Sequence, residues 1–364
     1  MSTGFDPLRV GIIGCGKISN AYYNGCKLYD ELELVHVADL DVERAKEVGE
    51  GWGVAQAGSV EGLLADASVE AVVNLTIPAA HAPVNEQALR AGKHVYLEKP
   101  LALTVEEALP VLALAEELGL RVSCAPDTFL GVSHQTARRA IDDGKIGRPT
   151  SATLFMQGRG HEHWHPAPEF YYKPGGGPLY DMGPYYLTDL VQLLGPIRRV
   201  SAMAGRAFEQ RAISSQPLAG QVIDVELDTH VAATLEMGSG AIVTLIMSFD
   251  IAKHSLPNIQ VHGTEGSLQV PDPNGFGGEV RVCAWGSDEW EEVPAIAPEA
   301  GQRGAGLADM ARAIREGGPH LVSAELALHV LEAMEAISES AASGRAVELR
   351  HVCERPGVLE PLSV

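Results

Sequence analysis

The chain has 364 residues with 27 Lys or Arg and 48 Asp or Glu, so its formal net charge is −21 with histidine neutral. This excess of acid argues against nucleic acid or an anionic membrane surface as a partner. The length is that of two domains, and a hydrophobic content of 46% is ordinary for a globular protein.

The cysteines and the N-terminal residues bear on the compartment. Five scattered cysteines without C-x-x-C spacing argue against a disulfide framework or a structural zinc site, and they fit a reducing cytosol. Residues 1–7 contain no signal-peptide core, and no apolar run reaches membrane-spanning length. We therefore expect a soluble cytoplasmic protein that makes no membrane contact.

The first 125 residues alternate between strand and helix signals. Helical patterns occur at Ala82–Ala91 and Val105–Leu118. Apolar runs of strand length occur at Val10–Ile13, Leu34–Ala38, Val69–Ile77, His94–Leu97 and Arg121–Cys124. This βαβ rhythm predicts a parallel sheet covered by helices on both faces, with ligands beyond the carboxyl ends of the strands.

A glycine loop follows the first predicted strand. Gly14 permits a tight turn, Gly16 lets the backbone approach a pyrophosphate, and Ser19 is small enough for close packing of the helix on the strand. The amides at the start of that helix, around Lys17 and Ile18, are predicted to hold the phosphates. Residues 1–125 are thus predicted to form a dinucleotide-binding domain.

Asp39 ends the second predicted strand, 25 residues after Gly14, where a carboxylate grips the adenosine ribose hydroxyls. A 2′-phosphate would face both Asp39 and Asp41, with Arg44 as the nearest cation in the sequence. We therefore predict NAD as the preferred cofactor over NADP.

Two further motifs lie at predicted strand ends. Thr76 and Pro78 are expected to contact the cofactor, as is His81, which could instead cap the next helix. Glu98 could pair with Lys99 or with the nicotinamide ribose. Lys99 could polarise a substrate hydroxyl and hold it for hydride transfer, or be a surface lysine in a loop.

Composition shifts near residues 144–149, and we assign residues 126–364 to a second domain. Its β-type runs are Thr150–Gln157, Val200–Ala207, Val222–Glu236, Ala241–Phe249 and Ile259–His262, with glycine turns between several of them. They predict a largely antiparallel sheet. The helices are predicted at Asp181–Leu194, Leu307–Glu316 and Ala324–Ser340, and the last two could pack back on the first domain.

Asp181 and Tyr185 lie one turn apart if the helix starts near Asp181, with Pro184 in its first turn. A phenol and a carboxylate aimed at one point could pass a proton and orient a polyol. Because a tyrosine is a poor base at neutral pH, this role for Tyr185 requires Lys99 nearby to lower its pKa. Alternatively, Asp181 is a helix N-cap and Tyr185 packs in the core.

Other candidates for substrate contact have competing interpretations. His161, His163 and His165 would share one face of a strand, as metal ligands do, but the segment could equally be a loop that contacts substrate, with Trp164 stacked on a sugar ring, or its side chains could serve packing alone. We favour the loop and no metal. Asp127 could line the substrate cleft or cap a helix beginning near Ser133.

The chain resembles the glucose–fructose oxidoreductase/inositol dehydrogenase/rhizopine-catabolism (Gfo/Idh/MocA) family. The resemblance runs through nearly the whole chain, from the glycine loop and Glu98–Pro100 to the segments 144–147, 175–186 and 263–266. It implies a Rossmann domain followed by an α+β domain with a large open sheet that forms homodimer or homotetramer contacts. It also implies that Lys99 is the catalytic lysine and Asp181 the substrate-binding acid.

Many members of the family carry histidine where this chain has Tyr185, so the chain resembles the subset with a tyrosine proton donor. The implied activity is NAD(P)-dependent hydride transfer to or from a hydroxyl-bearing carbon of a sugar, polyol or cyclic diol. Two alternatives stay open: an NAD-assisted glycoside hydrolase, and a catalytically inactive dinucleotide sensor. Lys99 and Tyr185 together argue against the sensor.

Overall fold

The computed structural model describes residues 6–297 and 301–359 of the chain. Its contacts divide these residues into two compact units. The first unit comprises residues 6–130, 301–331 and 359, and the second comprises residues 131–297 and 332–358. The first unit therefore includes a segment from late in the sequence.

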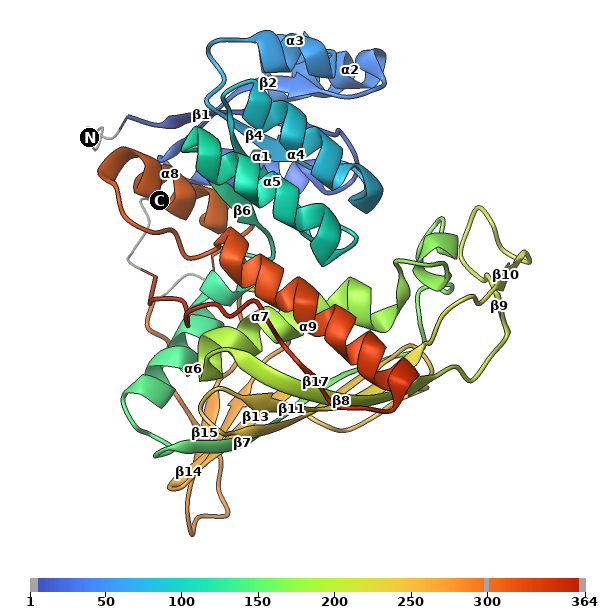
Figure 1. The fold of residues 1–364 in the computed structure, drawn as a ribbon, viewed down its shortest axis with the longest axis vertical. Coiled ribbons are helices and arrows are strands. Elements are labelled where there is room, and N and C mark those ends of the chain that lie inside the picture. The colour runs from blue at the N-terminus through green and yellow to red at the C-terminus, as the bar shows by residue number, and fades with distance from the viewer. Residues whose placement is uncertain (1–5, 298–300, 360–364) are drawn as a thin grey trace. The chain divides into compact units, whose positions relative to one another are not determined.

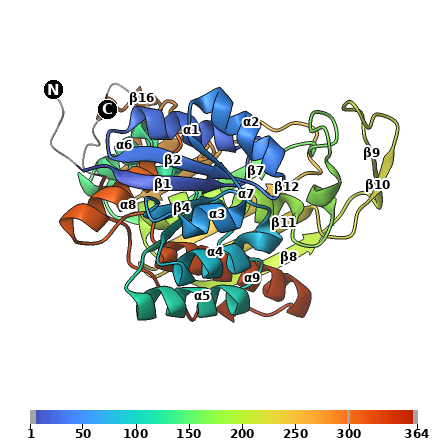
Figure 2. The same ribbon diagram turned by 90° about the horizontal axis from the view of Figure 1, so that it is seen from above.

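A six-stranded sheet with the order β3-β2-β1-β4-β5-β6 forms the centre of the first unit, and every strand pair in it is parallel. Figure 2 shows α1 and α2 on one side of this sheet and α4 and α5 on the other. The predicted parallel fold is confirmed. The strands are β1 (Leu8–Ile13), β2 (Leu32–Ala38), β3 (Gln56–Gly58), β4 (Ala71–Asn74), β5 (His94–Leu97) and β6 (Val122–Cys124). The helices are α1 (Ser19–Leu28), α2 (Val42–Trp52), α3 (Val60–Ala65), α4 (His81–Arg90), α5 (Val105–Leu118) and α8 (Ala305–Glu316), with 3₁₀ turns η1 (Pro78–Ala80) and η2 (Thr128–Leu130).

The strand predicted at Val69–Ile77 is much shorter in the structure. All residues of β4 are buried, as expected for a central parallel strand, but the strand ends at Asn74 instead of Ile77. The amide and hydroxyl of Thr76 both donate to the side-chain oxygen of Asn74, at 3.2 and 2.6 Å, and turn the chain out of the sheet. Ile77 is consequently 70% exposed.

The second unit is built on a nine-stranded sheet with the order β16-β15-β14-β13-β7-β12-β11-β8-β17. Its strand pairs are antiparallel except for β7 with β12, so the predicted mostly antiparallel sheet is confirmed. The predicted strand Val222–Glu236 is in fact two strands, because β10 pairs with β9 outside the large sheet. The strands are β7 (Pro149–Gln157), β8 (Ile197–Gly205), β9 (Gln210–Ala212), β10 (Val222–Asp224), β11 (His230–Met237), β12 (Ile242–Ser248), β13 (Ile259–Gly263), β14 (Gly266–Val270), β15 (Arg281–Ala284), β16 (Glu291–Glu292) and β17 (Val347–Glu348).

Helices cover one face of the large sheet (Figure 1). Contacts join α7 (Gly177–Leu194) to β7, β11 and β12, and α6 (Val132–Asp142) to β14. Residues 332–343 of α9 (Ala324–Ser343) belong to this unit, as does the 3₁₀ turn η3 (Glu169–Tyr172). Alternate residues of β11 and β12 are buried, whereas on the other face Met203 is 81% and Ile242 47% exposed. Within the described residues no helix has the length and hydrophobicity to cross a membrane.

Candidate functional site

The glycine loop after β1 contains two glycines with different physical requirements. Gly14 has a φ of 103°, and a Cβ on it would lie 2.8 Å from the carbonyl oxygen of Leu75. A Cβ on Gly16 would meet no atom within 4 Å. The fold therefore requires glycine at position 14. At position 16 it leaves open space, which a bound ligand could occupy close to the backbone.

The side chain of Asp39 is hydrogen-bonded to this loop. Its Oδ2 accepts a hydrogen bond from the backbone N–H of Cys15 at 2.7 Å, and its Oδ1 accepts one from the N–H of Asp41 at 2.9 Å. Asp41 has a structural role that the sequence analysis did not assign, because its carboxylate caps α2 through the N–H of Arg44 at 3.2 Å. Leu40, between the two acids, is 95% exposed.

The residues around this loop fit a dinucleotide. Lys17 is exposed and Ile18 is half-buried, immediately before the first residue of α1. Ser19 is 1% exposed, and its hydroxyl donates to the carbonyl of Gly16 at 2.6 Å, which fixes the turn into the helix. The open space at Gly16, the helix N-terminus and the carboxylate of Asp39 are the three features that pyrophosphate and ribose recognition needs.

His81 links the two strand-end loops of the first unit. It is fully buried, with Nδ1 2.7 Å from the carbonyl oxygen of Pro100 and Nε2 3.1 Å from that of Thr76. Burial lowers the pKa of His81 despite these two acceptors, so the imidazole is neutral and the shorter contact places its proton on Nδ1. The alternative of a helix cap is wrong, since α4 has no side-chain cap hydrogen bond.

Hydrogen bonds from side chains on both sides hold the segment that carries Lys99. Glu98 is 8% exposed and accepts from the hydroxyl of Tyr22 at 2.8 Å and from the N–H of Lys99 at 3.2 Å. On the other side, His81 holds the carbonyl of Pro100, and the Lys99–Pro100 peptide bond is cis. The half-buried Lys99 therefore lies between two residues, Glu98 and Pro100, that each make a hydrogen bond.

Asp127 binds the start of a helix other than the one near Ser133 that the sequence suggested as an alternative. Its Oδ2 accepts from the backbone N–H groups of Gly304 and Gly306, at 2.9 and 3.2 Å, at the start of α8. Burial raises the pKa of its carboxyl, which is opposed by the guanidinium of Arg303 at 3.5 Å. The alternative in which Asp127 caps a helix near Ser133 is wrong, because α6 has Gly131 at its N-cap and no side-chain cap.

In the second unit, the helix that carries Asp181 and Tyr185 begins four residues earlier than predicted. α7 starts at Gly177, so Asp181 is not its N-cap, and Pro184 lies inside the helix instead of in its first turn. Pro178 lies in the first turn of the helix, where proline is tolerated. Asp181 and Tyr185 remain one turn apart on one helix, and Tyr185 is 6% exposed.

The sequence left the role of His161 open, and the structure joins this residue to Asp181. Nε2 of His161 lies 2.8 Å from Oδ2 of Asp181, and its Nδ1 accepts from the indole N–H of Trp164 at 3.2 Å. The two residues are 20 positions apart, on a loop and a helix. No spacing rule could have paired them.

His163, Trp164 and His165 lie in a loop, so the alternative of three histidines on one strand face is wrong. His163 is exposed, Trp164 is 50% exposed, and the ring of His165 packs edge-on against Trp164 at 5.3 Å between centroids. Across the described ranges, no group of three or more His, Cys, Asp and Glu side chains is placed to hold a metal ion.

An ion network that the sequence analysis missed anchors this loop. Arg211 on β9 is 8% exposed; one of its nitrogens lies 2.8 Å from Glu162 and another contacts Asp250. The hydroxyl of Tyr172 also donates to Glu162. These partners are up to 49 residues apart in the chain, and only the fold brings them together.

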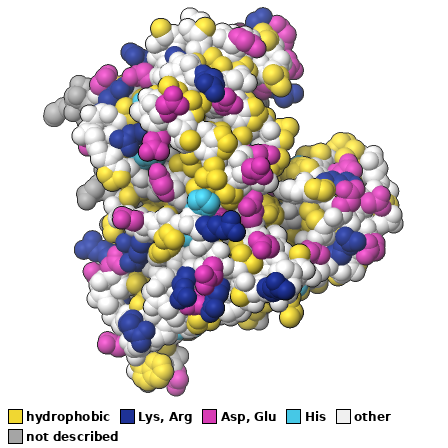
Figure 3. All heavy atoms as spheres, viewed as in Figure 1, with side chains coloured by type: hydrophobic (Ala, Val, Ile, Leu, Met, Phe, Trp, Pro, Cys, Tyr) yellow, Lys and Arg dark blue, Asp and Glu magenta, His cyan; other side chains and the backbone are white. Residues whose placement is uncertain are grey.

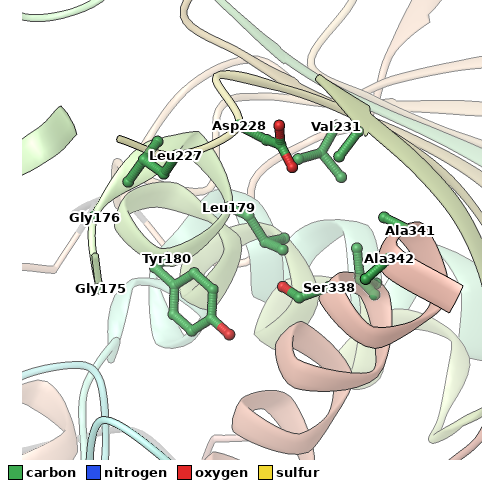
Figure 4. A pocket seen from close by; sticks show the side chains of 13 residues that line it. Gly175, Gly176, Leu179, Tyr180, Leu227, Asp228, Val231, Ser338, Ala341 and Ala342 are labelled. Carbon is green, nitrogen blue, oxygen red and sulfur yellow. The ribbon is translucent and has the colours of Figure 1, made fainter. Parts of the chain in front are cut away.

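A cavity of about 280 Å³ opens at the start of α7 (Figure 4). Apolar side chains such as Leu179 and Val231 make up much of its wall, and Tyr180, Asp228 and Ser338 are its polar side chains. The side chains of Tyr180 and Ser338 face each other in Figure 4. None of the residues predicted to be catalytic lines this cavity.

Comparison with known proteins adds independent evidence. Residues 8–125 match the model of the oxidoreductase family with an NAD-binding Rossmann fold, and residues 134–269 match the Gfo/Idh/MocA C-terminal domain. The chain is 30% identical to 1,5-anhydro-D-fructose reductase of Ensifer adhaerens over 71% of its length and 74% of the relative. It is also 30% identical to dTDP-3,4-didehydro-2,6-dideoxy-alpha-D-glucose 3-reductase of Streptomyces violaceoruber, over 85% of this chain and 86% of that one.

Solved structures share the fold. Levoglucosan dehydrogenase, solved in complex with NADH and L-sorbose, superimposes with a TM-score of 0.82 at 23% identity, covering 96% of this chain and all of that one. The family models together span most of the chain and agree with the parallel sheet, the glycine loop and the large open sheet. The chain belongs to the Gfo/Idh/MocA family of oxidoreductases, with an NAD-binding Rossmann fold.

Proposed function

We propose that the protein is an NAD(P)-dependent dehydrogenase or reductase acting at a hydroxyl-bearing carbon of a sugar, polyol or cyclic diol. The observation that carries this proposal is the glycine loop, where the fold requires Gly14 but leaves the space at Gly16 open beside Asp39. The two curated relatives named above are reductases with sugar-type names. When bound, the nicotinamide supplies the site that accepts or donates hydride.

Three side chains carry the proposed chemistry. The ammonium of Lys99 holds the substrate oxygen and stabilises its negative charge. The phenol of Tyr185 exchanges the hydroxyl proton, and Asp181, one turn away on α7, binds a neighbouring hydroxyl. Of the cofactor contacts, Gly14, Gly16, Lys17, Ile18 and Asp39 would hold the adenosine and phosphates, and Thr76, Pro78 and Glu98 would line the nicotinamide side. His81 was expected to contact the cofactor, but it is fully buried and its ring nitrogens face the carbonyls of Pro100 and Thr76, so it would act only by holding these two loops.

The test is a panel of sugars, polyols and dihydrodiols assayed by NADH absorbance, followed by variants on the best substrate. Tyr185→Phe should lower kcat by roughly 10²–10⁴, the factor expected for a lost general acid or base. Lys99→Met should lower it at least as much, because it removes both the charge and the positioning group. Unchanged turnover in either variant would overturn the assigned role.

Tyr186→Phe is the matched control. Tyr186 is the next residue on α7, is fully buried, and accepts a hydrogen bond from Asn258 at 2.8 Å. It should lose some stability and keep kcat within a few-fold of the parent. The same protein should turn over no nitrophenyl glycoside; turnover of glycoside without net NADH would favour the glycosidase alternative, which the reductase relatives do not support.

NAD is proposed as the preferred cofactor. Asp39 is the carboxylate nearest to the glycine loop, and the exposed side chain at position 40 is an uncharged leucine. A 2′-phosphate would meet the negative charge of both Asp39 and Asp41, with Arg44 as the nearest cation in the sequence. Steady-state kinetics should give a higher kcat/KM with NAD than with NADP; a strong preference for NADP would refute this interpretation of Asp39.

Leu40→Arg sharpens the test of cofactor choice, because it adds a cation at a position that is 95% exposed and needs no repacking. This variant should raise kcat/KM for NADP by about tenfold, the value of one charge-assisted hydrogen bond, and change the value for NAD little. Leu40→Gln should leave both values unchanged.

Substrate contacts are proposed in the loop that carries His163, Trp164 and His165. The half-exposed ring of Trp164 offers an apolar face to a sugar ring, and its N–H is already used by His161. Asp127 was expected to contact substrate, but its carboxylate is fully buried at the start of α8. We therefore propose Trp164 as the stronger candidate and expect Trp164→Ala to raise KM.

A homodimer or homotetramer through the large sheet is also proposed, in a reducing cytoplasm. Met203 and Ile242 are exposed apolar side chains on the face without helices, and the five cysteines are free thiols. Met203→Glu should shift the mass measured by light scattering to a smaller species. Leu256→Glu, at a 46% exposed position outside the sheet strands, should leave the mass unchanged.

A further inference from the structure

We propose that His161 is a positioning residue that holds the carboxylate of Asp181, and that Trp164 fixes the tautomer in which it does so. This inference rests on the proposed function only for the role of Asp181 toward substrate. The juxtaposition itself lies entirely within the second unit.

The direction of the hydrogen bonds follows from the donor inventory. The indole nitrogen of Trp164 can only donate, so the Nδ1 of His161 that it meets at 3.2 Å must be an acceptor without a proton. The neutral ring then carries its proton on Nε2, which lies 2.8 Å from Oδ2 of Asp181 and donates to it. A proton on Nδ1 would instead point at the indole N–H of Trp164, and two donors cannot form a hydrogen bond with each other.

Packing holds the imidazole in this orientation. The ring of Tyr171 lies with its centroid 4.0 Å from that of His161, at 69° between planes, and the ring of Phe249 lies at 4.7 Å. With Trp164 at 5.1 Å, three aromatic rings surround His161 and leave it few rotamers.

The backbone at His161 is also fixed. Its N–H donates to the hydroxyl of Tyr172 at 3.1 Å, and that hydroxyl in turn donates to Glu162. The carbonyl of Glu162 accepts from the N–H groups of Ser214 and Ser215, at 2.9 and 3.2 Å. Side-chain and backbone contacts of Glu162 therefore attach the loop to the segment after β9, and this attachment keeps His161 beside α7.

The hydrogen bond from His161 fixes the orientation of the Asp181 carboxylate. Because an N–H from His161 is bound at Oδ2, rotation of the Asp181 carboxylate is restricted, and its other oxygen has a preferred direction. Asp181 is then ready to accept a hydrogen bond from a substrate hydroxyl in one geometry, which favours substrates with a diol of the matching configuration.

The tautomer is tested by ¹⁵N NMR on protein labelled at histidine, without substrate or cofactor. The signals of His161 are identified as those lost in His161→Gln, and the expected pattern is protonated Nε2 with unprotonated Nδ1. Trp164→Phe keeps a ring but removes the N–H, and should shift the pattern toward a mixture of tautomers. Trp285→Phe, at an 81% exposed tryptophan, should leave the pattern unchanged.

Kinetics tests the positioning role. His161→Phe should lower kcat/KM by roughly 10–100-fold, the loss of one hydrogen bond to a charged group, mainly through KM. His161→Gln restores a donor at similar reach and should recover most of that loss. A His161 signal protonated on Nδ1, or equal kinetics for the Phe and Gln variants, would overturn the proposal.

The two proposals can fail separately. If no sugar, polyol or diol is turned over but the NMR pattern is as expected, the proposed function fails and the tautomer assignment stands. If substrate is turned over and the NMR pattern is wrong, the enzyme assignment stands and the role of His161 fails.

Discussion

Gly14 and Gly16 lie in the same loop, but the fold requires glycine only at position 14, whereas at position 16 we expect that the ligand requires it. Gly14 combines a positive φ with a close approach to the backbone of Leu75, so any side chain there is strained. Gly16 has no neighbour within 4 Å of a would-be Cβ. This contrast gives a matched pair of substitutions.

Gly16→Ala should fold with a thermal midpoint close to that of the parent and bind NAD at least tenfold more weakly, because its methyl group occupies space meant for the pyrophosphate. Gly14→Ala should be destabilised by roughly 1–3 kcal/mol through backbone strain. Calorimetry of unfolding and of NAD titration measures both. Equal NAD affinity in Gly16→Ala and parent would contradict the role of this loop.

Cysteine reactivity is also decided at the residue scale. Burial raises the pKa of Cys15 to about 11 and that of Cys26 to about 12, so both remain thiols at neutral pH. Cys283 is the half-exposed member of the five. Iodoacetamide at pH 8 should therefore modify Cys283 first, as read by peptide mass spectrometry; early labelling of Cys15 would contradict the buried loop.

At the scale of elements, a buried ion network attaches a loop to β9. Arg211 touches Glu162 and Asp250, and its removal leaves two carboxylates with little solvent. Arg211→Met should cost about 3–5 kcal/mol of unfolding free energy, the usual result of breaking a buried pair on one side. Chemical denaturation measures this loss.

Arg206→Met is the control for that loss. Arg206 pairs with Glu209 at 3.0 Å, where the Glu209 side chain is 79% exposed. Water and salt screen such surface pairs, so this variant should lose less than about 1 kcal/mol. Similar losses in the two arginine variants would show that the Arg211 network is not a buried anchor.

Helix α8 carries a carboxyl whose titration affects stability. Burial raises the pKa of Asp309 to about 6, although its Oδ2 accepts from the N–H of Leu321 at 2.5 Å. Between the unfolded pKa of about 4 and this value, the folded state binds more protons, so stability falls as pH rises through that range.

Asp309→Asn should remove this part of the pH dependence, which we expect to be about 2 kcal/mol between pH 4 and pH 6. Urea denaturation at a series of pH values measures it. The exposed Asp288→Asn should leave the slope unchanged. A parent protein whose Asp309-dependent stability instead rises with pH would show that the carboxyl is not raised by burial.

At the scale of the whole molecule, the net charge of −21 opposes compactness through self-repulsion. Figure 3 shows acidic side chains over much of the visible face, with basic ones among them. Raising NaCl from about 20 to 300 mM shortens the Debye length from about 20 Å to below 8 Å, so the thermal midpoint should rise. A falling midpoint would mean that attractive ion pairs outweigh the repulsion; sucrose at matched osmolality is the control.

The patterns of apolar residues along the chain were sufficient to predict most of the strands and helices. Strands such as β1 and β5 were predicted because they are continuous apolar runs, and such runs are typical of parallel strands that helices cover on both faces. The start of α7 and the end of β4 were predicted wrongly. In both places glycine, proline or polar side chains set the boundary by local hydrogen bonds that the hydrophobic pattern does not encode.

The sequence by itself determined the class of the molecule. A glycine loop, an acid after the second strand and a lysine at a strand end are local features, and together they indicate a dinucleotide-binding oxidoreductase. Only the tertiary structure decided which partners those residues have. Asp127 caps α8, His81 bridges two loops, and His161 holds Asp181. Each of these contacts joins residues that local spacing does not relate, and their geometry comes from packing of the whole unit.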